Sequence, residues 1–230
     1  MDEAPSPYDR IITALGELCL MWSGIDNVIH DISLHLSVLL NPAFEPYGPE
    51  EPRPWHLLHL ALGNMDERGR VATAKAYAHY ASEWLAVALS PAEANRYYTQ
   101  AEALLNYVDN VLRPERNRFV HDYWSIPGGT SVVRTKRGSQ VRRPQSHQRV
   151  VEAETKRVYA SLEQVEAFIL NLNYAYGDLV ELDNCASWML ALKEQPGRQP
   201  LQLPAEWQSL AHRGWRGEGK QFRPPRSSPG

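Results

Sequence analysis

Residues 8–41 read YDRIITALGELCLMWSGIDNVIHDISLHLSVLLN, and the spacing of their apolar side chains decides the fold class. These side chains follow one another at alternating steps of four and three residues: Ile11, Leu15, Leu18, Trp22, Ile25, Ile29, Ile32, Leu36 and Leu39. Such spacing places them on one face of an α-helix, whereas a strand would alternate every second residue. The helix is expected to end at Asn41, because the proline that follows disfavours helical geometry in the residue before it.

More helices follow a proline-rich connection at residues 41–54. A second helical region spans about 55–89 and is expected to break near Gly63-Asn64, since glycine weakens a helix. The segment Ser90-Pro91-Ala92-Glu93 then starts a new helix, because serine caps it, proline fits its first turn and glutamate completes a capping box. Pro114 predicts a kink or a restart of this helix, with further turns up to Trp124.

The last long helix shows the same four–three spacing from Val158 to Leu190, with Asp183 as its one polar intrusion. Residues 130–150, before this helix, hold two short apolar pieces around a glycine. They favour either a ragged β-hairpin or a long basic loop. From Gln195 onward Pro, Gly, Gln and Arg dominate, and the tail is expected to be disordered or ordered only against a partner. Its possible anchors are Trp207, Trp215 and Phe222.

The elements together predict an all-α fold: an antiparallel helical bundle of four to five helices. A basic loop or β-hairpin is inserted at about 127–150. Residues 1–194 are expected to form the helical domain, and residues 195–230 the tail.

The composition is that of a globular protein, with 43% hydrophobic and 22% charged residues in 230. A chain of this length buries a sufficient core without disulfides or metal. Cys19 and Cys185 lie inside helical patterns and are expected to be buried structural thiols. The N-terminus is acidic and no run of ~18 consecutive apolar residues is present, so we predict a soluble, cytoplasmic protein without a membrane span.

The net charge of −3 conceals a strong asymmetry along the chain. Residues 113–149 contain nine Arg and Lys against two acidic residues, a net charge of +7, while the rest of the chain carries −10. An acidic body with one basic stretch predicts that this stretch meets a polyanion. A solvated loop that charge keeps soluble is the alternative.

Within the basic stretch, residues 113–124 read RPERNRFVHDYW. In a helix Asn117 and His121 share a face, and Arg116 lies about 140° from His121 but has a side chain long enough to reach the same anion. Histidine is suited to moving protons near neutral pH, and arginine grips phosphate oxygens through paired donors. Together they suit metal-independent cleavage of RNA. The histidine would move the proton of the 2′-hydroxyl or of the leaving 5′-oxygen, and the arginine would stabilise the charge on the phosphate.

The segment Arg116-Asn117-x-x-x-His121, followed by an aromatic residue, resembles the R-N-x-x-x-H signature of the HEPN superfamily of small all-α domains that act on nucleic acids. Two upstream segments are similar to one bacterial branch of it: Leu15-Gly16 through Trp22 with Ile25-Asp26, and Met65-Asp66-x-Arg68-x-Arg70-Val71. The likeness covers roughly residues 8–190 as an order of helices, and only the six-residue signature is specific.

This resemblance implies a helical bundle with the motif near a dimer axis, where two copies build one composite site. It also implies a metal-independent endoribonuclease that leaves a 2′,3′-cyclic phosphate and a 5′-hydroxyl. Members serve as toxins, phage-defence effectors or RNA-processing enzymes, and some only bind. Arg116 and His121 match the catalytic residues, and Asn117 matches the usual polar second position. The insertion departs from the minimal pattern; it could grip RNA or cover the site.

We therefore predict a homodimeric, cytoplasmic endoribonuclease of toxin or phage-defence type that requires no metal or other cofactor. Arg116 and His121 are its predicted catalytic residues, and Asn117 is predicted to support them. The residues predicted to hold RNA are Arg113, Arg118, Arg134, Lys136, Arg137, Arg142 and Arg143. One alternative is a non-catalytic helical module that binds RNA or a protein such as an antitoxin. Another is a bundle whose motif only tethers helices, with Arg116 paired to a carboxylate. His56 and His59 lack further ligands at zinc-site spacing. Asp26 is expected on a solvated face, and the alternative is that its carboxylate contributes to the site.

Overall fold

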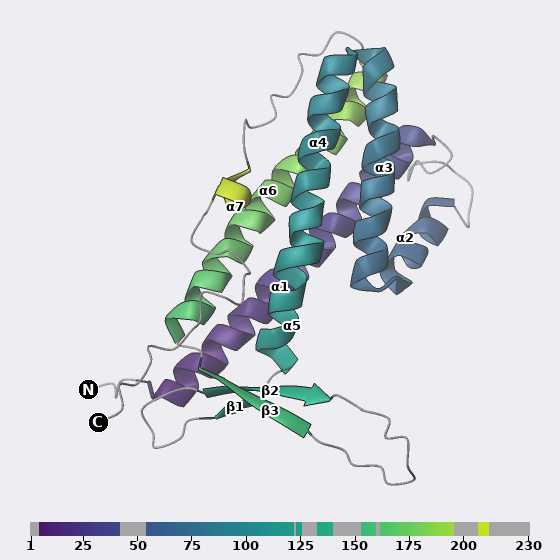
Figure 1. Ribbon diagram of the computed structural model, residues 1–230. Helices are drawn as coiled ribbons and strands as arrows, with labels where there is room; N and C mark the ends of the chain where they lie inside the picture. The colour runs from purple at the N-terminus through teal and green to yellow at the C-terminus, as the bar shows by residue number, and fades with distance from the viewer. Residues whose placement is uncertain are drawn as a thin grey trace, which may run out of the picture.

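The computed structural model describes residues 5–41, 54–121, 123–125, 133–139, 153–159, 162–195 and 207–211. The described part contains helices α1 (Pro7–Leu40), α2 (Pro54–Asn64), α3 (Glu67–Ala88), α4 (Pro91–Tyr107), α5 (Arg113–His121), α6 (Leu162–Glu194) and α7 (Gln208–Ala211), a π-helical turn η2 (Val108–Leu112), and strands β1 (Tyr123–Ser125), β2 (Val133–Ser139) and β3 (Ala153–Tyr159) (Figure 1). The main buried apolar cluster is built from helical side chains and from Trp207, which directly precedes α7. The helical class is therefore confirmed for the described core.

Helix α1 is the central element, and its predicted apolar stripe is its buried face. Leu18, Ile25 and Ile32 are fully buried. Ser6 caps the helix by accepting from the backbone N–H of Asp9, whose carboxylate accepts in return, so the first turn is satisfied on both sides. The helix ends at Leu40, one residue before Asn41, as the following proline predicts.

By length and composition, α1 also meets the requirements of a membrane-crossing helix over Tyr8–Leu40, with a mean hydropathy of 1.2. The core helix of a soluble protein meets the same requirements. The soluble and cytoplasmic state of the protein therefore stays a prediction.

The prediction of an antiparallel bundle is wrong for the two longest helices, because α1 and α6 run in the same direction. Arg10 lies 3.8 Å from Glu166 near the start of both helices, and His35 lies 2.7 Å from Asp183 nearer their ends. Helix α3 starts beside the middle of α1, where Glu67 bonds Trp22 and Arg70 bonds Asp26, and it runs alongside α1 in the same sense. The short helix α2 and the α4–α5 arm run against α1, α3 and α6 (Figure 1). Helix spacing alone does not encode these directions.

The expected kink at Pro114 takes the form of a π-helical turn. In η2 the backbone N–H of Arg113 donates to the carbonyl of Val108, five residues back. Proline has no N–H to donate, and a wider turn just before it accommodates the missing hydrogen bond. The chain therefore passes from α4 into α5 without a break, and α5 carries the signature residues beside α1.

The last helix begins at Leu162 and not near Val158, which corrects the sequence prediction. Residues 153–159 instead form β3, which pairs antiparallel with β2 from Val133↔Tyr159 to Ser139↔Ala153, while β1 pairs with the other edge of β2. Val158 and Tyr159 favour extended structure, and pairing with β2 overrides the helical spacing. The sheet therefore extends beyond the predicted insertion at both ends. The apolar piece at Val141 lies outside the described residues.

The tail prediction is corrected for residues 207–211, which pack on their own helical body. Trp207 is 2% exposed, and its Nε1–H donates to the carbonyl of Gln100 on α4 at 2.8 Å. The buried carboxylate of Asp178 on α6 accepts from the backbone N–H groups of Gln208 and Ser209 at 3.0 and 2.7 Å. Trp207 is thus an anchor as the sequence suggests, but for an intramolecular contact.

Candidate functional site

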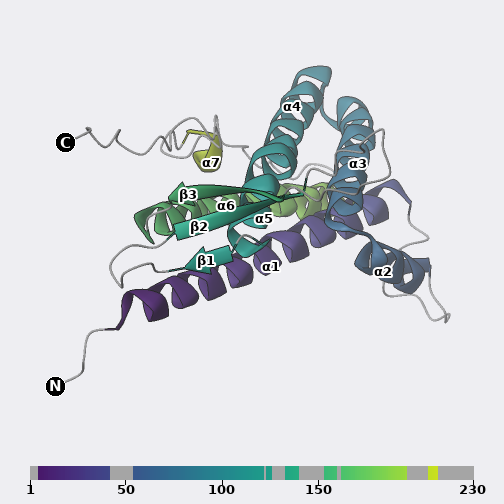
Figure 2. The same ribbon diagram turned by 60° about the horizontal axis from the view of Figure 1, so that its bottom comes forward.

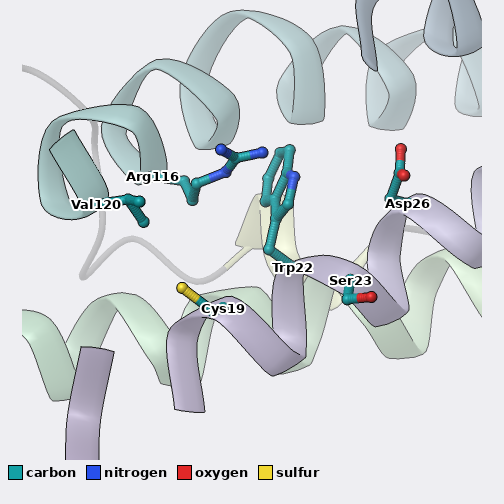
Figure 3. A pocket seen from close by; sticks show the side chains of 6 residues that line it. All are labelled: Cys19, Trp22, Ser23, Asp26, Arg116 and Val120. Atoms are coloured by element: carbon teal, nitrogen blue, oxygen red, sulfur yellow. The ribbon is translucent and has the colours of Figure 1, made fainter. Parts of the chain in front are cut away.

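Arg116 of α5 lies in the wall of an open pocket between α5 and α1 (Figure 3). The pocket has a volume of about 270 Å³, and its lining residues are Cys19, Trp22, Ser23, Asp26, Arg116 and Val120. Four of these six come from α1, since residues 19, 22, 23 and 26 project from one side of that helix. The signature arginine therefore faces the first helix, α1.

Trp22 and Glu67 fix the Arg116 side chain. The guanidinium carbon lies 4.7 Å from the centroid of the Trp22 ring, a cation–π contact. Nη2 of Arg116 donates to Oε1 of Glu67, and the Nε1–H of Trp22 donates to the same oxygen at 3.2 Å. Glu67 is the first residue of α3, where the helix dipole favours a negative charge. Three helices thus converge on one ion pair.

The Arg116 guanidinium is largely withdrawn from water, with 13% of its side chain exposed. Burial lowers its pKa from the ordinary arginine value, while the nearby Cys19 and Asp26 act in the opposite direction. Arginine remains charged in proteins even so. Its Nε is buried and has no hydrogen-bond partner among the described residues. An unpaired buried donor is uncommon in folded proteins and indicates a group that a bound water or ligand oxygen can satisfy.

Asp26 takes part in a second ion pair beside the first. Arg70 donates from Nε and Nη2 to the two Asp26 carboxylate oxygens at 2.9 and 2.6 Å, a bidentate arrangement. The Arg70 side chain is 14% exposed. The expectation that Asp26 lies on a solvated face is therefore wrong: it joins α1 to α3 and lines the pocket.

His121 ends α5 and is exposed, whereas Asn117 is half-buried on the same helix. The two share a face by their spacing, as predicted. His121 is not among the residues that line the Arg116 pocket. Within one chain, therefore, the described structure does not bring the imidazole and the guanidinium to the same cavity.

Two of the arginines predicted to hold RNA form ion pairs with carboxylates of the helical body, although Arg118 is 40% exposed. Arg113 bonds the Asp109 carboxylate at 2.8 Å and is 13% exposed, and Arg118 bonds the buried carboxylate of Glu115 at 2.8 Å. These contacts favour a structural role for Arg113 in particular. The other predicted residues fall into two groups: Arg134, Lys136 and Arg137 lie on β2, and Arg142 and Arg143 lie outside the described residues.

The two cysteines differ. Cys185 is buried, and burial raises its pKa to about 12, as expected for a structural thiol. Cys19 is exposed and lines the pocket, so its prediction as a buried residue is wrong. It lies within the predicted helix, on the side of α1 that lines the open pocket facing α5.

Glu67 is the site residue that sequence reasoning missed. It occupies an unspecified position directly after Asp66 in the second-helix segment of the HEPN resemblance. Asp66 caps α3 by accepting from Gly69 at 2.7 Å. An N-cap at Asp66 predicts that Glu67 lies in the first turn of a helix. It does not predict that Glu67 contacts Arg116, because that contact depends on how α3 packs.

The histidines elsewhere form pairs without a metal-binding group. His30 Nε2 and His59 Nδ1 lie 2.9 Å apart, and His35 Nδ1 lies 2.7 Å from an oxygen of Asp183. The polar intrusion in α6 thus has a partner on α1. No cluster of three or more His, Cys, Asp or Glu side chains suited to a metal ion occurs among the residues that the structure describes.

Comparison of this chain with protein-family models, curated proteins and solved structures finds no match. The resemblance to the HEPN superfamily therefore rests on the signature and on the order of helices given above.

Proposed function

We propose that the protein is a metal-independent endoribonuclease in which Arg116 and His121 act on the same phosphodiester. The observation that supports this most is the state of Arg116: a cation fixed by Trp22 and Glu67 at the edge of an open pocket, with a buried N–H left unpaired. Preorganised donors of this kind stabilise charge that develops in a transition state. The same helix presents an exposed imidazole at its end.

The chemistry requires one proton acceptor and one proton donor. His121 accepts the proton of a ribose 2′-hydroxyl, the 2′-oxygen attacks phosphorus, and the bond from phosphorus to the 5′-oxygen breaks. A second histidine gives its proton to the leaving 5′-oxygen. The products are a 2′,3′-cyclic phosphate and a 5′-hydroxyl, and Arg116 stabilises the additional negative charge in between.

A second copy of the chain would supply the second histidine. Exposed residues of α1 next to the pocket form a patch without charge: Ile12 is 51% and Leu20 76% exposed, and nothing lies within 4 Å of a side chain built at Gly16. Val120, beside the pocket on α5, is also exposed. In a symmetric dimer the same patch meets itself, which an uncharged face permits without repulsion. The toxin or phage-defence role that the resemblance implies belongs to this proposal.

The direct test incubates purified wild-type protein, His121→Ala and Arg116→Ala with RNA in EDTA. We expect the wild type to produce fragments with 2′,3′-cyclic phosphate and 5′-hydroxyl ends, and each variant to lose about 10²-fold or more in rate. His79→Ala, which removes an exposed histidine of α3, is the matched control. Absence of cleavage by the wild type, or equal cleavage by the variants, would contradict the proposal.

A second candidate is supported by the ion pair itself. Arg116 bonds Glu67, as expected if the motif only tethers α5 to α3 in a non-catalytic module that binds RNA or a protein such as an antitoxin. In that case Arg116→Ala lowers the melting temperature, His121→Ala changes little, and RNA is bound without being cut.

A further inference from the structure

We infer that the three-stranded sheet β1–β2–β3 is a binding surface for the phosphate backbone of RNA, and that Lys156 and Arg157 of β3 belong to it together with the basic residues of β2. This inference rests on the proposed function for the identity of the polyanion. Lys156 and Arg157 lie outside the basic stretch 113–149 that the sequence indicates, directly before the helix predicted from Val158.

The charge of the two longer strands is strongly one-sided. β2 and β3 together contain five basic residues and one acidic residue: Arg134, Lys136, Arg137, Lys156 and Arg157 against Glu154. In the sequence these residues stand about twenty positions apart. The antiparallel pairing of β2 with β3 places them in one small sheet.

The register adds a more specific observation. Lys136 pairs directly with Lys156, and the next pairs on the same face of the sheet are Arg134↔Val158 and Gly138↔Glu154. Three basic residues therefore share this face with a single carboxylate, that of Glu154. Like charges at directly opposed positions destabilise an antiparallel pair, whereas opposite charges stabilise it. A sheet built for stability alone would favour a carboxylate at one of the two positions. Phosphate groups remove the repulsion when they bind, and their number makes binding dependent on salt.

The sheet also lies where the proposed chemistry takes place. It crosses the end of the helical body at which α5 ends and α6 begins (Figures 1 and 2). β1 starts two residues after His121, and Tyr123 pairs with Thr135, the neighbour of Lys136. By chain geometry the backbone of Lys136 lies no more than about 17 Å from that of His121. An RNA strand on the sheet therefore passes close to the exposed imidazole.

The experiment measures binding of a fluorescent single-stranded RNA of mixed sequence, with His121→Ala as the background so that no cleavage intervenes. Lys136→Glu and Lys156→Glu are added separately. Arg96→Glu is the matched control, with the same change of charge at an exposed position of α4, toward the opposite end of the helical body. Dissociation constants are determined between about 50 and 200 mM salt.

Each lysine reversal is expected to weaken binding at least tenfold and to reduce the salt slope by about 0.7 per lost phosphate contact, while Arg96→Glu changes neither. Each reversal also creates an opposite-charge pair at Lys136↔Lys156, so the melting temperature should hold or rise. If the lysines instead stabilise the fold, each reversal should lower the melting temperature. Lys156→Gln, which removes one charge without adding another, separates lost attraction from new repulsion.

The result that overturns the inference is RNA binding by both lysine variants equal to that of the Arg96→Glu control. That outcome leaves the endoribonuclease proposal intact, since cleavage by the unmodified chain is measured separately. Failure of the His121→Ala background to bind RNA at any salt concentration would instead contradict both.

Discussion

Removal of the Trp207 side chain tests whether the C-terminal segment is a structural part of the helical body. Trp207 is 2% exposed, and its indole N–H is bonded to the Gln100 carbonyl. Trp→Ala at a buried site costs about 3–5 kcal/mol. Loss of the indole also frees the segment that supplies the two N–H donors of Asp178, so the buried carboxylate loses its partners.

This destabilisation is large for a chain of this size. In proteins of 150–250 residues each kcal/mol shifts the melting temperature by about 2–4 °C, so Trp207→Ala should melt about 10 °C below the wild type. Thermal unfolding followed by far-ultraviolet circular dichroism measures the shift, and denaturant titration gives the free energy of unfolding. Trp207→Phe is the control, because it keeps an aromatic ring and removes only the N–H. It should lose about 1 kcal/mol.

The reasoning fails if Trp207→Ala melts within a degree of the wild type. It also fails if the phenylalanine variant loses as much stability as the alanine variant, since packing would then contribute little. The first result would mean that residues 207–211 are not held on α4 and α6. The second would mean that the hydrogen bond to Gln100, and not burial of the ring, holds them there.

Three further predictions concern the site, the dimer and the effect of pH. Glu67→Gln should reduce RNA cleavage about 10- to 100-fold through misplacement of Arg116, measured as initial rate, whereas Glu93→Gln in the first turn of α4 should not. If the chain forms the proposed dimer, Leu20→Lys should convert it to a monomer in light scattering, whereas Val87→Lys, at a residue 90% exposed on α3, should leave the mass unchanged. A wild-type monomer of 26.1 kDa would contradict the composite site. The pKa of His35 is raised, chiefly by its hydrogen bond to Asp183. Protonated His35 therefore contributes its full stabilisation at pH values below the ordinary histidine pKa. This contribution is lost as the pH rises through the raised pKa of the folded protein. The difference in melting temperature between wild type and His35→Gln should therefore be greater at about pH 5.5 than at about pH 9, and a constant difference would count against this ion pair.

The sequence predicts helices well where burial alone determines them. The α1 stripe, the Ser90 cap and the break after Asn64 all follow from local spacing and capping chemistry, and the structure has each of them. The same spacing fails at Val158, because a helical period in a short segment does not exclude a strand that finds a partner. That partner, β2, is distant in sequence, so no local pattern indicates the pairing.

The candidate site is only half predictable for a related reason. Arg116 and His121 follow from the signature, but the groups that fix Arg116 come from other helices. The apolar spacing predicts that Trp22 is a core residue, and it is 7% exposed. Its ring also makes the cation–π contact with the guanidinium of Arg116. Glu67 comes from the start of α3, which meets α5 only because α3 runs parallel to α1. The relative direction of two packed helices depends on the connection between them. The spacing of apolar residues along each helix does not predict it.

The structure divides the basic stretch that the sequence presents as one feature. Arg113, Arg116 and Arg118, all on α5, each bond a carboxylate, and those carboxylates belong to α3, α5 and η2. Their charges are thus compensated within the helical body, and a polyanion gains little from them at long range. The surplus remains with the residues after His121, of which the described ones lie on the sheet. RNA binding and RNA cleavage would then depend on different residues. Strands β2 and β3 would bind the RNA backbone, while Arg116 and His121 of α5 would act on one phosphodiester linkage. This separation explains why the sheet lysines should affect affinity and its salt dependence, whereas Arg116 and His121 should affect the rate of cleavage.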